Sequence, residues 1–281
     1  MFRKYVFDTN IKGKNILVLG GVHGNEVAGT IAQQKIIEQI ENGLFRLKAG
    51  RVTFIPCVNE KAQEIDERFV DVNLNRVVRF HQNPQNNEEK IANELIKEID
   101  ACDIMLDLHS THCEGDEEFA FIDYPVTENV ELLSLMPVKN ALAGWPEIYD
   151  ENDNVENFCT ERYAHANGKA GITVECGYHK SEKSIEVAKK SIFNVLAYYG
   201  VIEGFVPEIS EPKLIKLDRF VVKKANGLMN RNYQNLSEVK KGEILATYDN
   251  GEQIICEFDG FVIIPNHNAE INTEWFYLGH L

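Results

Sequence analysis

Short apolar runs that alternate with stretches of helical periodicity are the feature that most constrains the fold of this chain. The run NILVLG at 15–20 contains no charged residue and ends at the pair Gly20-Gly21. A run this short and continuous is typical of a strand covered on both faces, as in a parallel sheet. From Glu26 the apolar residues recur at helical spacing until Gly43, which predicts a helix directly after the strand.

The same alternation continues over the first 200 residues. Further strands are predicted at VTFIPCVN (52–59), DIMLDLH (103–109), FAFIDY (119–124) and GITVEC (171–176), and further helices at 88–100 and 184–199. The polar, Asn-rich segment 60–87 is predicted to be a functional loop. Strands that alternate with helices predict an α/β fold, a mostly parallel mixed sheet flanked by helices.

The pattern changes after about residue 207. Pro207 and Pro212 bracket a predicted linker, and beyond it apolar and polar residues alternate between turn signals such as Asp259-Gly260. This pattern favours a small antiparallel β-domain. We therefore expect a larger domain over 1–207, which would carry the catalytic site, and a C-terminal β-domain over 208–281.

Composition excludes several classes of function. The chain has 44 acidic and 29 basic residues, a formal charge of −15, and this balance argues against binding to nucleic acid or to an anionic membrane. It contains neither an apolar stretch of the roughly 20 residues that span a bilayer nor an apolar signal region near its first residues. Six scattered cysteines without CxxC spacing are typical of reduced thiols, so we expect a cytoplasmic protein.

Four ionisable side chains follow or end three of the predicted strands. His23 and Glu26 come after the first strand, His109 ends the strand at 103–109, and Glu175 lies near the end of the strand at 171–176. In open α/β sheets, ligands bind outside the carboxyl ends of the strands. If these strands are parallel and adjacent, all four side chains can meet in one cleft.

Two imidazoles and one carboxylate are a known ligand set for a catalytic zinc ion with a position open for water. His23, Glu26 and His109 are therefore the candidate ligands of one Zn²⁺ per chain, and Glu175 is the candidate general base for the water. Each signal also has a structural interpretation: the histidine after Gly-Gly caps a helix, His109 forms a buried pair with Asp107, and Glu175 forms an ion pair.

The motifs GGVHGNE, NLNR, DLHST and TVECG, in this order, make the chain resemble the succinylglutamate desuccinylase/aspartoacylase family. That family consists of zinc amidohydrolases related to metallocarboxypeptidases. The resemblance covers most of 15–200, and FDGFVIIPN with EWFYLG resembles the family's C-terminal β-domain. It implies the same zinc ligands and the same general base.

The resemblance also implies roles for residues of the 60–87 segment. Arg68 stands where the family has an arginine that polarises the substrate carbonyl, and Asn75 and Arg76 match the pair that binds a substrate carboxylate. Asn73 departs from the aspartate that the family usually has there, a residue expected to orient a metal-binding histidine. The family's substrate-pocket tyrosine from the C-terminal domain has no clear match, although Tyr248 and Tyr277 are available.

Other features have two interpretations. Arg162 either binds a second substrate carboxylate or is an ordinary charged residue of the surface. The acidic segment 114–118 is a solvated loop or, at the rim of the cleft, would favour a substrate with a cationic side chain. Cys176 is next to Glu175 and could therefore be a nucleophile. Successive side chains of a strand point to opposite faces, however, which favours a buried thiol. Glycines near Gly20 vaguely resemble a phosphate loop, yet neither GxGxxG nor a following Gly-Lys-Ser/Thr is present.

These observations predict a zinc-dependent hydrolase that cleaves the amide bond of a small N-acyl amino acid by metal-activated water. The alternatives are a carboxypeptidase-like metallopeptidase acting on short peptides, and a non-catalytic domain that binds metal or a small acid. The sequence leaves open the acyl group, the amino acid and whether the chain forms a homo-oligomer.

Overall fold

A computed structural model describes residues 2–150 and 158–281. Its strands are β1 (Tyr5–Asp8), β2 (Asn15–Gly20), β3 (Arg51–Ile55), β4 (Ile104–Thr111), β5 (Phe119–Phe121), β6 (Asn140–Ala143), β7 (Ala170–Tyr178), β8 (Lys213–Val222), β9 (Gly227–Met229), β10 (Ser237–Val239), β11 (Ile244–Tyr248), β12 (Gln253–Ile255), β13 (Gly260–Ile263) and β14 (Glu274–His280). Its helices are α1 (Val27–Glu41), α2 (Glu60–Glu64), the 3₁₀ turn η1 (Leu74–Arg76), α3 (Asn87–Asp100), α4 (Thr127–Ser134), α5 (Trp145–Asp150), α6 (Thr160–Ala166) and α7 (Glu182–Tyr198).

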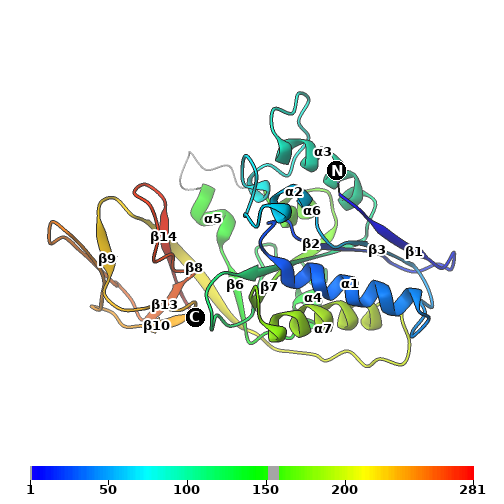
Figure 1. Ribbon diagram of the computed structural model, residues 1–281. Coiled ribbons are helices and arrows are strands. Elements are labelled where there is room, and N and C mark those ends of the chain that lie inside the picture. Colours follow the sequence, from blue (N-terminus) through cyan, green and yellow to red (C-terminus); the bar gives the residue numbers. More distant parts are fainter. Residues whose placement is uncertain (1, 151–157) are drawn as a thin grey trace.

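Eleven of the strands form one sheet, in the order β1-β3-β2-β4-β7-β5-β6-β8-β14-β13-β10. The central strands β3, β2, β4 and β7 are parallel, whereas β1 and β5 run antiparallel to their neighbours β3 and β7. Helices α1 and α7 cover one face of the sheet and α3 and α6 the other (Figure 1). The predicted α/β fold with a mostly parallel mixed sheet is confirmed.

The central strands are apolar because both of their faces are covered. One hydrophobic core includes Ile16 and Val18 of β2 with Ile36 of α1, and the other includes Leu17 of β2 with Leu95 of α3. Successive residues of one strand thus enter opposite cores, which explains why NILVLG is a continuous apolar run.

Several elements differ from those predicted. The strand predicted at 52–59 ends at Ile55, directly before a proline, which has no N–H to continue the ladder. The predicted loop 60–87 contains α2 and η1, and α4, α5, α6, β1 and β6 were not predicted. Strands of three or four residues carry too few alternating positions to stand out in a sequence.

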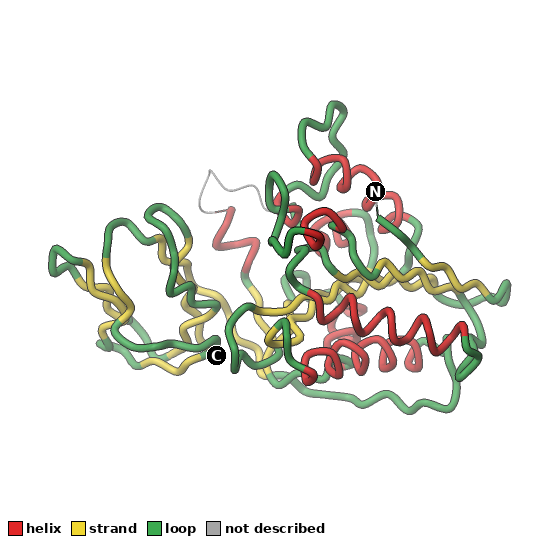
Figure 2. The backbone as a smooth tube through the Cα atoms, viewed as in Figure 1, coloured by secondary structure: helices red, strands yellow, loops and turns green. Residues whose placement is uncertain are grey.

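The C-terminal strands continue the main sheet (Figure 2). β8 pairs in parallel with β6, and β14, β13 and β10 follow in antiparallel register. β12, β11 and β9 form a separate three-stranded antiparallel sheet, and a core around Trp275 and Phe276 fills the space inside this part. The predicted antiparallel strands are thus present, while the domain boundary at 207/208 stays a prediction.

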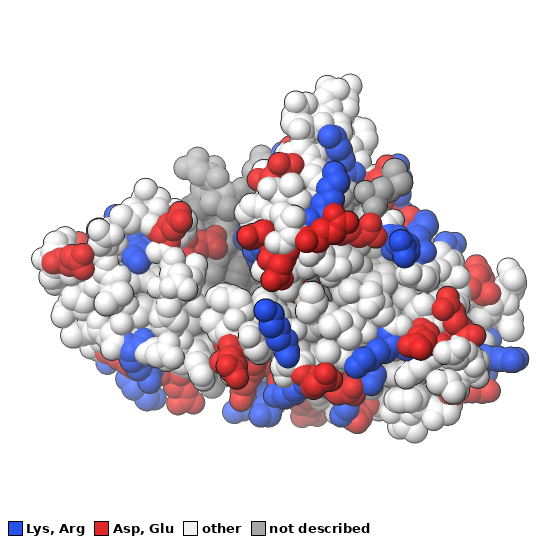
Figure 3. Space-filling model, in the orientation of Figure 1, with Lys and Arg blue, Asp and Glu red and all other residues white. Residues whose placement is uncertain are grey.

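The surface carries charges of both signs. On the face shown in Figure 3, Lys and Arg side chains are interspersed with Asp and Glu. Among the described residues, no helix is long and apolar enough to cross a bilayer.

Candidate active site

The site lies where three parallel strands end. β2, β4 and β7 are neighbours in the sheet, and His109 of β4 is the register partner of Glu175 of β7. His23 follows β2 by three residues, so its side chain reaches the same edge. One cavity is lined by His23, His109 and Glu175 together with Arg68, Asn75 and Arg76.

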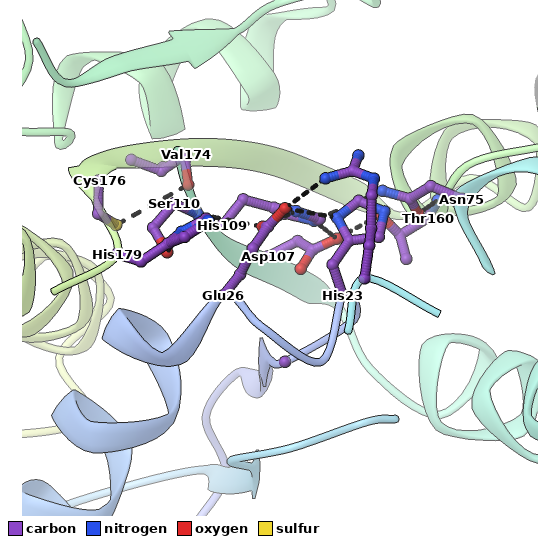
Figure 4. A network of polar contacts seen from close by, with 12 residues as sticks. His23, Glu26, Asn75, Asp107, His109, Ser110, Thr160, Val174, Cys176 and His179 are labelled. Carbon is purple, nitrogen blue, oxygen red and sulfur yellow. Dashed lines mark hydrogen bonds and ion pairs between the residues drawn. The ribbon is translucent and has the colours of Figure 1, made fainter. Parts of the chain in front are cut away.

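A tight glycine turn brings His23 and Glu26 to this edge. Gly21 has φ +55°, a backbone conformation that residues with a side chain rarely adopt. At Gly24 a Cβ atom would lie 2.3 Å from the backbone of Ala62 in α2, so only glycine fits there. Glu26 is the N-cap residue of α1, but its carboxylate does not cap the helix. In Figure 4 it instead lies between the two imidazoles.

The Glu26 carboxylate contacts both histidines. Its Oε1 lies 2.8 Å from His23 Nδ1, and its Oε2 lies 2.7 Å from His109 Nδ1. One ligand atom from each of the three residues lies within 4.8 Å of the others, and all three side chains are buried. Two imidazole nitrogens and a carboxylate oxygen gathered this closely fit a single Zn²⁺.

Each imidazole also has an oxygen neighbour at Nε2, the ring nitrogen that does not contact Glu26. Asn73 Oδ1 lies 3.0 Å from His23 Nε2, and Asp107 Oδ2 lies 3.1 Å from His109 Nε2. Thr160 Oγ1 donates to the same Asp107 oxygen at 2.6 Å. Partners of this kind fix the ring orientation and the tautomer of metal-binding histidines. Asn73 thus lies where a residue that orients His23 would be needed.

The charges of the three residues depend on one another. Burial and the neighbouring Arg68 lower the pKa of His23 to about 4, so its imidazole is neutral at physiological pH, as metal binding requires. Burial opposes ionisation of Glu26, but the adjacent imidazoles hold its pKa well below the ordinary range. For His109, the carboxylates of Asp107 and Glu26 outweigh burial and raise the pKa well above its usual value.

Glu175 faces the same cavity with an oxygen that is not hydrogen-bonded. Its Oε2 is buried and has no hydrogen-bond partner among the described residues. Burial, followed by the nearby negative charge of Glu26, raises the pKa of Glu175 to about 8. A carboxyl group with a pKa near neutrality can both accept and return a proton.

Arg68, Asn75 and Arg76 come from the segment after α2, and a buried carboxylate holds the backbone between Arg68 and Asn75. Glu88 at the start of α3 accepts hydrogen bonds from the backbone N–H groups of Val70, Asp71 and Val72. Glu88 is fully buried, and no sequence motif marked it. It is one of several acids in the predicted helix 88–100, so the sequence contained no signal that distinguished it.

Two of these three residues contact the cluster formed by His23, Glu26 and His109. Arg68 Nη1 donates to Glu26 Oε1 at 2.7 Å, and Asn75 Nδ2 lies 3.5 Å from His109 Nε2. The Arg76 guanidinium lies over the ring of Tyr149 and donates to its hydroxyl at 3.3 Å. Two guanidinium groups therefore border the space in front of Glu175.

The remaining walls of the cavity were not predicted from sequence as a set. They comprise Phe121, Asp123, Trp145, Cys159, Glu161, Thr173, Ile264, Glu274 and Tyr277. Thr173 lies two residues before Glu175 on the same face of β7, so strand periodicity was a usable signal for it. Glu274 and Tyr277 of β14, and Ile264 directly after β13, come from the C-terminal part of the chain and close the cavity. Of the two candidate tyrosines, Tyr277 therefore lines the cavity, while Tyr248 is buried in the C-terminal core.

Two other candidates lie away from the cavity. Arg162 is not among the described residues that line it, and its guanidinium lies over the ring of Phe158. Its role as a carboxylate-binding residue stays a prediction. Cys176 belongs to the core under α7, with its thiol directed to the Val174 carbonyl, as strand alternation predicted.

Comparison with known proteins shows which family the chain is related to. The family model for the succinylglutamate desuccinylase/aspartoacylase catalytic domain matches residues 12–199. A succinylglutamate desuccinylase of Pseudomonas fluorescens is 25% identical over 271 residues, which cover 90% of this chain and 79% of that protein. An N-alpha-acetyl-L-2,4-diaminobutyric acid deacetylase of Halomonas elongata is 27% identical over 260 residues, 85% of this chain and 71% of that protein.

Solved structures show the same fold. A succinylglutamate desuccinylase/aspartoacylase from Rhodobacter sphaeroides superposes with a TM-score of 0.79 at 20% identity, covering 99% of this chain and 88% of the other. The product-bound ectoine utilization protein EutE (DoeB) from Ruegeria pomeroyi gives 0.78 at 21% identity, with the same coverage. Since the family match extends over most of the chain and includes β2, β4 and β7, this protein belongs to the succinylglutamate desuccinylase/aspartoacylase family.

Proposed function

We propose that this protein is a zinc-dependent hydrolase that releases the free amino acid from a small N-acyl amino acid. The observation that carries the proposal is the buried, unpartnered oxygen of Glu175 in the cavity that His23 and His109 also line. A protein that only binds a metal or an acid has no need for a base at this place. One zinc ion per chain and a cytoplasmic location belong to the same proposal.

A zinc ion held by His23, Glu26 and His109 would supply Lewis acidity and make the attacking water more acidic. Glu175 accepts the proton of that water and returns it to the nitrogen of the leaving amine. Its raised pKa favours the second step, because the protonated carboxyl is stable in its buried surroundings.

Arg68 would stabilise negative charge on the carbonyl oxygen as the amide becomes tetrahedral. Its guanidinium already lies against Glu26, at the border of the cavity, and hydrogen-bond donors fixed in advance stabilise developing charge most effectively. Asn75 and Arg76 would bind the carboxylate of the amino acid, since a guanidinium fork matches a planar carboxylate. This contact would place the amide between Arg68 and Glu175.

The family relatives named above support an acyl amino acid as substrate, because they include a desuccinylase and a deacetylase. The C-terminal residues Ile264, Glu274 and Tyr277 close one side of the cavity, which favours a small substrate over a peptide.

The test is amine release from N-acyl derivatives of all common amino acids, compared with a matched panel of dipeptides. We expect hydrolysis of one or a few acyl amino acids, with kcat/KM well above that for any dipeptide. A preference for dipeptides would instead support a carboxypeptidase-like enzyme. Stoichiometric zinc without turnover of either panel would support a non-catalytic domain.

A further inference from the structure

We infer that a second cavity next to the catalytic residues receives the acyl group, and that this acyl group carries no charge. The inference rests on the proposed function and names its class of substrate. The residues that line the second cavity include Arg68, Ser110, Thr111, Asp116, Glu175 and His179.

The two cavities meet at the proposed reacting groups. Arg68 and Glu175 line both of them, whereas Asn75 and Arg76 line only the first. An amide held at Arg68 and Glu175 extends in two directions, toward its amino acid and toward its acyl group. Because the carboxylate of the amino acid binds on the side of Arg76, the acyl group lies on the other side, in the second cavity.

The lining of the second cavity offers no free cationic partner for a carboxylate. Arg68, the one arginine among its described lining residues, is already paired with Glu26 at 2.7 Å, and Asp116 adds a negative charge. An acyl group with its own carboxylate, such as succinyl, would lie near Asp116 without an opposite charge to pair with, and unpaired like charges at close range disfavour binding.

The histidines of the second cavity supply little opposing charge. His179 is buried, and its Nδ1 lies 2.9 Å from Ser110 Oγ. Burial lowers the pKa of His179, which keeps its imidazole neutral. His112 is exposed, so its side chain is solvated at the rim. The neutral wall formed by Ser110 and Thr111 is suited to an uncharged group such as acetyl.

Asp116 is the charge most specific to this cavity. Its Oδ1 accepts a hydrogen bond at 3.2 Å from the backbone N–H of Asn235, which fixes the carboxylate against the C-terminal part of the chain. The neighbouring acids are engaged elsewhere: Glu117 lies 3.9 Å from Lys139 Nζ, and Glu118 lies 2.6 Å from Lys183 Nζ. The acidic segment 114–118 therefore acts on the acyl side through Asp116.

The experiment compares kcat/KM for N-acetyl and N-succinyl derivatives of the same amino acids. We expect the wild-type protein to favour the acetyl series by about tenfold or more. Asp116→Asn keeps a side-chain oxygen that accepts the hydrogen bond from Asn235 N–H but removes the negative charge. It should therefore raise kcat/KM for the succinyl series and lower the acetyl-to-succinyl ratio of kcat/KM about threefold or more. Glu117→Gln is the matched control and should leave the ratio unchanged.

A faster reaction with the succinyl series, or an unchanged ratio in Asp116→Asn, would overturn the inference while leaving the proposed hydrolase intact. Absence of amine release from both series, in a protein with its full metal content, would contradict the proposed function itself and the inference with it.

Discussion

Asn73 Oδ1 lies 3.0 Å from His23 Nε2, on the side of the imidazole opposite Glu26. His109 has an equivalent neighbour in the Asp107 carboxylate, so the two histidines are oriented by one neutral and one charged oxygen. A neutral amide oxygen accepts a hydrogen bond from the imidazole N–H but leaves the ring less basic than a carboxylate would.

The first prediction concerns the effect of the Asn73 side chain on zinc affinity. Asn73→Asp should tighten zinc binding, because a carboxylate makes His23 a stronger ligand, and Asn73→Ala should weaken it about 10- to 100-fold. Competition with a chelator of known affinity measures both changes. Asn83→Ala, at an exposed asparagine of the same segment, is the control. Equal affinity in all four proteins would show that Asn73 has no influence on the metal.

Replacement of the proposed base separates chemistry from binding. Glu175→Gln keeps the size of the side chain but cannot accept a proton, so kcat should fall about 10²- to 10⁴-fold while bound zinc stays the same. Steady-state amine release and metal analysis of the same preparation provide the two readings. Glu186→Gln, at the exposed end of an ion pair with Lys189, should behave like wild type. Nearly full activity in Glu175→Gln would remove this residue from the mechanism.

The carboxylate-binding role of Arg76 predicts an effect on substrate binding. Arg76→Gln should raise KM about 10- to 100-fold, since a hydrogen bond between charged groups is lost, with a smaller change in kcat. Arg76→Lys should recover only part of the loss, because an ammonium group cannot form the bidentate pair. Exposed Arg46→Gln is the control. An unchanged KM in Arg76→Gln would place the substrate carboxylate elsewhere.

Asp123, a partly buried acid of the cavity, predicts how stability depends on pH. Burial raises the pKa of Asp123 from an ordinary value of 3.8 to about 7. Between these values the unfolded chain has released the proton and the folded chain has kept it, so the free energy of unfolding falls as pH rises and levels off above the folded-state pKa. In Asp123→Asn the free energy of unfolding should not fall in this way as pH rises. The asparagine side-chain oxygen can still accept the hydrogen bond from Trp145 N–H.

Urea unfolding of both proteins at several pH values measures the difference. Relative to wild type, Asp123→Asn should gain about 1 to 2 kcal/mol between pH 5 and pH 6.5, given about 1.4 kcal/mol for each pKa unit. Unfolding free energies that stay parallel over this range would contradict the raised pKa of Asp123.

Much of the fold and the centre of the site could be predicted from local patterns. NILVLG identified β2 because a strand between two cores is apolar throughout, and strand ends placed His23, His109 and Glu175 at one edge of the sheet. The walls of the cavity could not be predicted in this way. Glu274 and Tyr277 approach the site only because β8 extends the main sheet beyond β6, a long-range pairing that no local pattern encodes. Glu88 likewise appeared as an ordinary helix acid until its backbone partners were known.

The most direct test of the account is a zinc titration of metal-free protein, followed by amine release from the best acyl amino acid. The account predicts no hydrolysis by the metal-free protein, activity that rises linearly up to one zinc ion per chain, and loss of both zinc binding and activity in His109→Ala. Undiminished hydrolysis by protein that has been freed of metal would contradict it.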